Sequence, residues 1–142
     1  MPAVMGSNIP DQGVTSRMLN LTASAVLVVT DESSTSVTFA DLATGGPAIT
    51  PASGVTQEQL IIWSCGLYLT GGTSTVIASV ALAGGAASDN DDVRLDAAAG
   101  VIATGAQSTV ASQATGVANT MKYRVAAQTG HWFNRHLSQV GI

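Results

Sequence analysis

The sequence has few charged and few aromatic side chains. Charged residues make up 10% and aromatic residues 4% of its 142 residues, whereas about 25% of an ordinary soluble domain is charged. Hydrophobic residues account for 46%. A disordered chain is excluded, since disordered chains are charge-rich and poor in Val, Ile and Leu. The 5 Lys and Arg against 9 acidic residues are too few to neutralise a phosphate backbone, so we expect no nucleic-acid partner.

Cysteine and long apolar runs are also scarce. The single cysteine, Cys65, has no partner for an intramolecular disulfide, and its apolar neighbours favour a packed side chain over a reactive thiol. No run of about 18 apolar residues is present, so we expect no membrane span and no membrane partner. The small-x-small site at 23–25 precedes the apolar run 26–29, which is the wrong order for a secretory cleavage site.

What is present begins with an aperiodic segment. Residues 1–19 contain prolines and glycines without hydrophobic periodicity, which predicts an extended N-terminal arm. The arm is interpreted either as a loose terminus or as a segment that reaches a neighbouring protein. Its candidate contact residues are Pro2, Val4, Ile9, Val14 and Arg17.

From residue 20 to residue 142 the pattern is that of one β domain. Apolar residues alternate with mixed ones from Gln59 to Leu69, which predicts a central strand with one face in the core. Shorter strands are expected at 26–30, 35–39, 75–82, 93–95, 101–104, 109–111, 121–127 and 132–140, with a turn at 31–34. Short strands with Gly- and Ser-rich breaks at about ten-residue intervals predict an all-β fold, an antiparallel β-sandwich or jelly roll.

Metal-ligating side chains gather at one place. Asp89, Asp91 and Asp92, with Asp96 nearby, form an acidic loop that is the best Ca²⁺ candidate. The alternative is a solvated loop, because the Gly and Glu positions of an EF-hand are absent. His131 and His136 lie an odd number of residues apart, which places them on opposite faces of a strand and argues against a shared metal.

No catalytic motif is present. The chain lacks a Gly-x-Ser-x-Gly elbow and a phosphate-binding Gly-Lys-Ser/Thr turn, and nothing local orients either histidine as a base. Glu58 and Asp41 are candidates for a pair of hydrolytic carboxylates by elimination only. We therefore expect no enzyme and no cofactor.

The scarce aromatic residues indicate where protein contacts lie. Trp63 falls on the apolar side of the central strand and is expected in the core. Trp132 and Phe133 are adjacent and point to opposite sides, so one of them needs a second apolar surface, either a covering loop or another subunit. With only Lys122 to blunt strand edges, the low charge favours a homo-oligomer. Candidate interface residues are Tyr68, Trp132 and Phe133.

The C-terminal segment carries a resemblance. Residues 121–125 (Met-Lys-Tyr-Arg-Val) and 129–137 (Thr-Gly-His-Trp-Phe-Asn-Arg-His-Leu) resemble the closing hairpin of small jelly-roll proteins of tailed-phage virions. The Thr, Ala, Gly and Val bias is similar as well. The segment 126–128 departs from the pattern, which has more Gly before the turn.

The resemblance implies a virion location and no catalytic residue. Proteins of this kind are trimeric decoration (cement) proteins of the head, head fibres or tail-fibre knobs. The short arm favours a decoration protein that forms trimers on the outer capsid surface and binds the major capsid protein. The alternatives are a receptor- or glycan-binding knob, with Tyr68, Tyr123 or Trp132 beside carboxylates, and a small hydrolase that uses Glu58 or Asp41.

Overall fold

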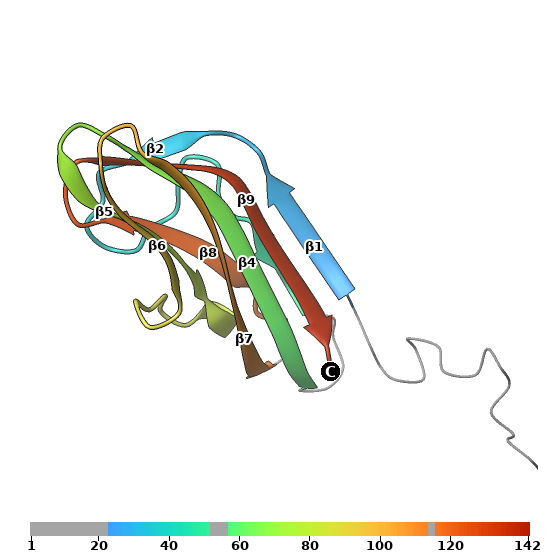
Figure 1. Ribbon diagram of the computed structural model, residues 1–142. Coiled ribbons are helices and arrows are strands. Elements are labelled where there is room, and N and C mark those ends of the chain that lie inside the picture. Colours follow the sequence, from blue (N-terminus) through green and yellow to red (C-terminus); the bar gives the residue numbers. More distant parts are fainter. Residues whose placement is uncertain (1–22, 52–56, 114–115) are drawn as a thin grey trace, which may run out of the picture.

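The computed structural model describes residues 23–51, 57–113 and 116–142. The described residues form a sandwich of two antiparallel sheets (Figure 1). The elements in chain order are β1 (Ala23–Val28), β2 (Glu32–Ser34), β3 (Ala48–Ile49), β4 (Gln57–Thr70), β5 (Thr73–Ala81), a 3-10 helix η1 (Leu82–Gly84), β6 (Asp92–Ala98), β7 (Ile102–Gln113), β8 (Asn119–Val125) and β9 (Thr129–Gly141).

The order of strands is that of a jelly roll. One sheet, sheet A, has the order β1-β9-β4-β7, and β2 continues the line of β1 along β9. The other, sheet B, has the order β3-β8-β5-β6. Each of the steps β4 to β5, β6 to β7 and β8 to β9 crosses from one sheet to the other, which is the double Greek key of a jelly roll. The predicted all-β antiparallel sandwich is confirmed.

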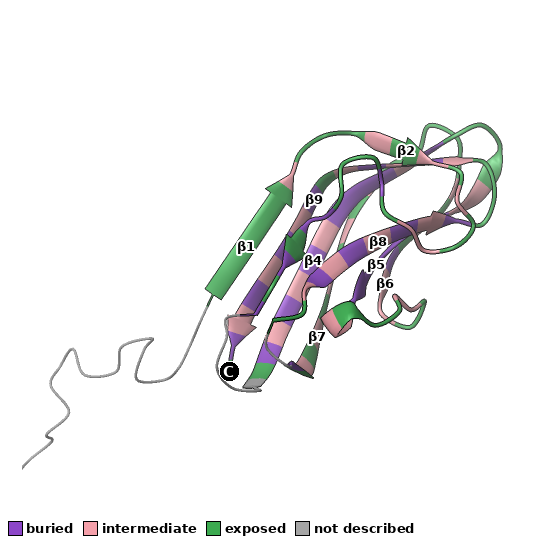
Figure 2. Cartoon of the chain, turned by 180° about the vertical axis from the view of Figure 1, so that it is seen from behind, coloured by how far each residue is buried: buried purple, intermediate pink, exposed green. Residues whose placement is uncertain are grey.

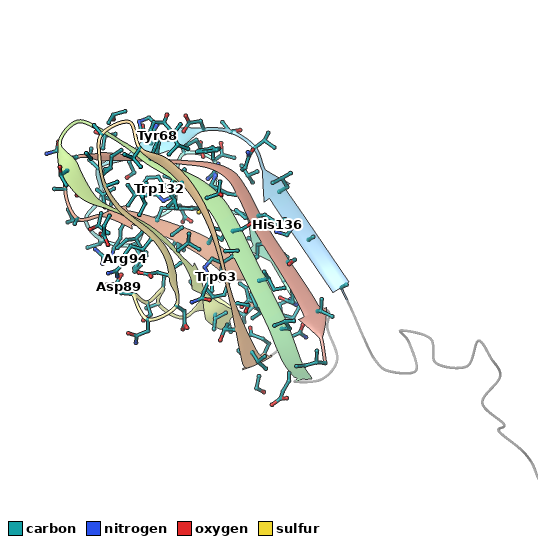
Figure 3. All side chains as sticks on the ribbon, viewed as in Figure 1. Trp63, Tyr68, Asp89, Arg94, Trp132 and His136 are labelled. Atoms are coloured by element: carbon teal, nitrogen blue, oxygen red, sulfur yellow. The ribbon has the colours of Figure 1, made fainter. Side chains whose placement is uncertain are left out.

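The core lies between the sheets and is organised by β4. The alternation predicted for 59–69 is confirmed, because the inward residues from Ile61 to Leu69 are buried, Trp63 and Cys65 among them. Trp132 enters the core from β9, where its ring lies 5.5 Å from that of Tyr123 and its Nε1 donates to the carbonyl of Ile77 at 3.1 Å. Figure 3 shows both tryptophans between the sheets.

Two expected boundaries were wrong. β2 occupies Glu32–Ser34, where a turn was predicted, and residues 35–39 form no strand. The reason is tertiary: β2 pairs with β9, while the next residues cross toward sheet B, where the Ser36 carbonyl accepts from Val125 N and Ala40 pairs with Tyr123.

The segments expected at 101–104 and 109–111 are one strand. β7 runs unbroken from Ile102 to Gln113 and pairs with β4 along its length. Gly105 does not interrupt it. Glycine is instead needed here because Val93 of β6 packs against this position, and a Cβ on Gly105 would lie only 2.5 Å from Val93 Cγ1.

A bulge in β9 changes which residues share a face. Asn134 has a φ of 47°, and the pairing of β9 with β4 shifts between Ser64 and Gly66. Asn tolerates this left-handed conformation better than most residues. Trp132 and Arg135 are both buried as a result. His131 and His136 therefore lie on the same outer face, and their predicted placement on opposite faces was wrong because it assumed an unbroken alternation.

Candidate interaction surface

The outer face of sheet A consists mainly of small and aliphatic side chains, with His136 in β9 and one charged residue, Glu58, at its margin near the start of β4. We call this surface the neutral face. It comprises Ala23, Ala25 and Leu27 of β1, His136, Ser138 and Val140 of β9, Leu60, Ile62 and Ser64 of β4, and Ile102, Thr104, Ala106, Ser108 and Val110 of β7. Leu27, Ile102 and Val110 are 57%, 65% and 54% exposed. A shallow depression lined by Ile62, Ala106, Gln107 and Ser108 lies on it.

Charge is concentrated on the opposite side of the molecule. The outward side chains of β6 and β8 include Asp92, Arg94, Asp96, Lys122 and Arg124. Their ion pairs join Arg94 to Asp92, Lys122 to Asp41 and Arg124 to Asp89, at 2.7 to 2.8 Å. Figure 3 shows Asp89 and Arg94 beside β6, away from His136. One sheet thus carries the charge that keeps a surface hydrated, and the other carries almost none.

An aromatic cluster borders the neutral face near β2. The rings of Tyr68 and His131 stack with centroids 4.2 Å apart. The Phe133 ring lies over Gly66, where a Cβ would be only 2.2 Å from it. The centroid of the Phe133 ring is 6.2 Å from that of Tyr68. The phenol O–H of Tyr68 donates to Asp31 Oδ2 at 2.6 Å, and this hydrogen bond, with burial and the Asp31 charge, raises the pKa of Tyr68. The cluster is an amphipathic platform of the kind that protein interfaces favour.

His131 lies between a carboxylate and a hydroxyl. Its Nδ1 is 3.3 Å from Asp31 Oδ1, and its Nε2 is 3.3 Å from Thr70 Oγ1. Sequence reasoning found nothing to orient this histidine, because Asp31 lies 100 residues away in the chain. The order carboxylate, imidazole, hydroxyl is also that of a nucleophile-activating triad. Here the carboxylate holds Tyr68 as well, and the exposed Thr70 hydroxyl lies 3.5 Å from the carbonyl of Thr129. The contacts thus fix the orientation of the stacked rings.

A buried ion pair holds the bulge of β9 in place beneath this cluster. Arg135 is 0% exposed, and its Nη2 donates to Glu32 Oε2 at 2.5 Å while Nη1 lies 3.3 and 3.4 Å from the carbonyls of Thr44 and Gly46. The guanidinium also lies over the Tyr123 ring at 5.5 Å. Burial raises the pKa of Glu32, but hydrogen bonds from Thr44 and the charge of Arg135 outweigh it and hold that pKa below 4.5. Sequence reasoning missed this pair, since a lone arginine in a strand resembles a surface residue.

The predicted interface residues divide between core and surface. Tyr68 and Phe133 are partly exposed on the outer face of sheet A and stay candidates. Trp132 is fully buried in the core of its own subunit. The expectation that one of the adjacent aromatics faces the core and the other faces outward therefore fits, but Trp132 itself has no surface to offer a partner. The arm residues Pro2, Val4, Ile9, Val14 and Arg17 lie outside the described residues.

The acidic loop holds ion pairs. Asp89 pairs with Arg124, and Asp92 pairs with Arg94. Within the described ranges, no group of three His, Cys, Asp or Glu side chains is placed to hold a metal ion. The geometry thus gives no support to Asp89, Asp91 and Asp92 as a Ca²⁺ site.

The two carboxylates named for hydrolysis lie on different sheets. Asp41 binds Lys122 on the sheet B side, at 2.8 Å. Glu58 is exposed near the start of β4 in sheet A, where its carbonyl accepts from Ile142 N. No described contact joins them, so the geometry does not favour a paired-carboxylate site.

Comparisons with known proteins bear on the fold. No protein-family model and no curated protein matches the chain, and none of the helices among the described residues is long and apolar enough to cross a bilayer. A chain in the structure of infectious bursal disease virus Gx strain is similar, with a TM-score of 0.50 and 14% identity over 84% of this chain. The match covers 33% of that viral chain. At this identity the likeness shows the fold alone, a β-sandwich also found in a viral protein.

Proposed function

We propose that the protein is a structural component of a virus particle and acts by binding other protein. The neutral face carries this proposal, because a free monomer would expose it to water without the charge that keeps surfaces hydrated. The likeness in fold to a chain of a virus structure supports the same role. So does the resemblance of the C-terminal hairpin to small virion proteins of tailed phages.

The finer form of the proposal is a non-enzymatic capsid decoration protein. Trimers would sit on the outer head surface, with the arm of residues 1–19 along the major capsid protein. A standard interface of about 1,600 Å², repeated by symmetry, gives avidity without strong single contacts. The added contact area would strengthen the shell against internal pressure.

Co-sedimentation with capsids of the encoding virus tests this role. We expect the full chain to bind at a fixed, saturating stoichiometry. A variant lacking residues 2–16 should lose capsid binding and keep its native mass and circular dichroism. Full-length protein that stays in the supernatant contradicts the decoration role. Binding retained by the shortened variant contradicts the role of the arm.

A glycan-binding knob is the second candidate. One observation favours it: Tyr68 is a partly exposed aromatic residue that lies beside a carboxylate, Asp31, to which its phenol donates. A glycan array with the wild type and Tyr68→Ala tests it. Saccharide binding that Tyr68→Ala abolishes would favour the knob.

A substrate screen tests the non-enzymatic part of the proposal. We expect no turnover of ester or glycoside substrates by the purified protein. Hydrolysis that disappears in both His131→Ala and Thr70→Val would show that the Asp31–His131–Thr70 row is catalytic and would contradict the proposal.

A further inference from the structure

The edges of the two sheets are protected to different degrees. Sheet B ends on one side with β3, which is two residues long, and on the other with β6, whose outward residues include Asp92, Arg94 and Asp96. Short length and charge are the devices that stop an edge strand from pairing with another chain. Sheet A ends with β1, of 6 residues, and β7, of 12 residues. Neither strand contains a charged residue or a proline.

Both edges of sheet A are also incompletely covered by the other described residues of the subunit. Five of the six residues of β1 are exposed, and they include side chains on both faces of the strand. Figure 2 shows the strand exposed along its length. Val26 is 37% exposed although its pairing partner Leu137 is fully buried. On β7 the inward residues from Ala103 to Ala111 are only half-buried. Among the described strands, β1 and β2 pair with β9 alone and β7 pairs with β4 alone.

The geometry points to head-to-tail pairing of β7 in one copy with β1 in the next copy, which makes sheet A continuous across subunits. The strands β1, β9, β4 and β7 are antiparallel in succession, so β1 and β7 run in opposite directions. A neighbouring copy placed beside β7 in the same orientation therefore presents β1 antiparallel to it, and the alternation of the sheet continues. Because neither strand carries a charged side chain, their approach meets no charge repulsion and buries no charge.

A head-to-tail arrangement of copies fits these edges better than a two-fold arrangement does. Pairing of β7 with β7 of a two-fold-related copy would leave β1 bare. A head-to-tail contact covers both edges with one kind of interface, and it closes a ring when the rotation between copies allows. β7 is longer than β1 by six residues, so β1 of the neighbour pairs with part of its length. The inference rests on the homo-oligomer of the proposed function and assigns its interface.

Cysteine cross-linking of the full-length protein tests the pairing. Cys65 is buried, so introduced cysteines are the reactive ones in the native protein. Ala25 of β1 and Ala106 of β7 are both exposed on the neutral face. We expect co-expressed Ala25→Cys and Ala106→Cys chains, carrying different tags, to form a mixed dimer with a short bis-maleimide. Thr104→Cys and Ser108→Cys replace Ala106→Cys to sample the neighbouring registers.

The remaining samples decide between arrangements. Each single variant alone should give no cross-linked dimer, and a chain carrying both cysteines should give a ladder that stops at the ring size. A dimer from Ala106→Cys alone would overturn the inference in favour of two-fold pairing. Absence of a mixed dimer in all registers, with the native mass still oligomeric, would overturn it in favour of another interface.

A matched pair of lysine variants gives a second readout. Ala106→Lys places a charge on the edge strand of sheet A, and Ala98→Lys places one on the edge strand of sheet B, both at exposed alanines. We expect Ala106→Lys to shift the native mass to that of a monomer and Ala98→Lys to leave it unchanged. Equal effects of the two variants would overturn the inference. Because both experiments use free protein, failed capsid binding with intact cross-links would refute the decoration role and leave the interface standing.

Discussion

Arg135 and Glu32 form an ion pair inside the sandwich, with 2.5 Å between Nη2 and Oε2, although they lie 103 residues apart in the chain. The pair joins β9, at its bulge, to β2, which pairs with β9 at the edge of sheet A. Asp31 directly precedes β2, so the pair also fixes the local geometry that brings Asp31 to the rings of Tyr68 and His131. The aromatic cluster on the surface depends on this buried contact.

Removal of the carboxylate should cost the fold more than loss of a surface pair. Glu32→Ala leaves the guanidinium of Arg135 buried without its counter-charge, so we expect a loss of about 3–5 kcal/mol in the free energy of unfolding. Asp41→Asn is the matched control, because the Lys122–Asp41 pair has side chains that are 26% and 52% exposed, and such pairs contribute about 1 kcal/mol or less. Urea unfolding of both variants measures the difference. Equal losses would show that the buried pair has no special role.

The same pair makes stability depend on acid. The pKa of Glu32 is lower in the folded protein than its ordinary value of 4.5, so the unfolded chain takes up this proton first as the pH falls. The stabilisation is present well above the ordinary pKa of the carboxyl and is lost progressively as the pH falls through the folded pKa. Glu32→Gln should show a smaller decline of unfolding free energy over this acid range than the wild type. An identical decline in both proteins would contradict the assignment.

Cys65 should be inert while the protein is folded. Burial raises the pKa of its thiol to about 12, an effect that outweighs the nearby Arg135 charge, so the thiolate is not populated near neutral pH. We expect no reaction with an aromatic disulfide reagent in buffer at neutral pH and one thiol per chain in denaturant. Rapid reaction of the native protein would contradict the packing of β4.

Glycines in the sandwich should differ sharply in their tolerance of alanine. A Cβ on Gly130 would lie 2.3 Å from Val125 and 2.8 Å from Trp132, whereas a Cβ on Gly45 meets nothing within 4 Å. Overpacking of a core costs about 1–3 kcal/mol, so Gly130→Ala should lower the unfolding free energy by this amount. Gly45→Ala should change it by less than about 0.5 kcal/mol. Similar results for both variants would contradict the close packing of Gly130 against Val125 and Trp132.

The fold was predictable where burial is strong. The alternation from Ile61 to Leu69 identified β4 because this strand is covered on one face along its length. β7 was split into two expected segments because its inward residues are small and half-buried, which leaves little hydrophobic contrast, and because Gly105 resembles a break. The strand β2 was missed because its position depends on pairing with β9 and on the Glu32–Arg135 contact.

The candidate site was predictable only in part. Tyr68 and Phe133 were expected at a contact surface on the basis of their scarcity and position, which is still a prediction. The partnership of Asp31 with His131 depends on long-range pairing that no local spacing encodes. The shared face of His131 and His136 depends on the bulge, whose one signal in the sequence is Asn134, a residue that tolerates positive φ within a strand.

Sedimentation velocity over a wide range of protein concentrations most directly tests whether the protein associates with itself through sheet A. We expect a discrete oligomer that persists on dilution and in high salt, because its contacts are apolar and neutral. We also expect Val110→Asp and Ile102→Asp on β7 to yield monomers that remain folded by circular dichroism. A wild-type chain that sediments as a soluble monomer at high concentration would contradict this account.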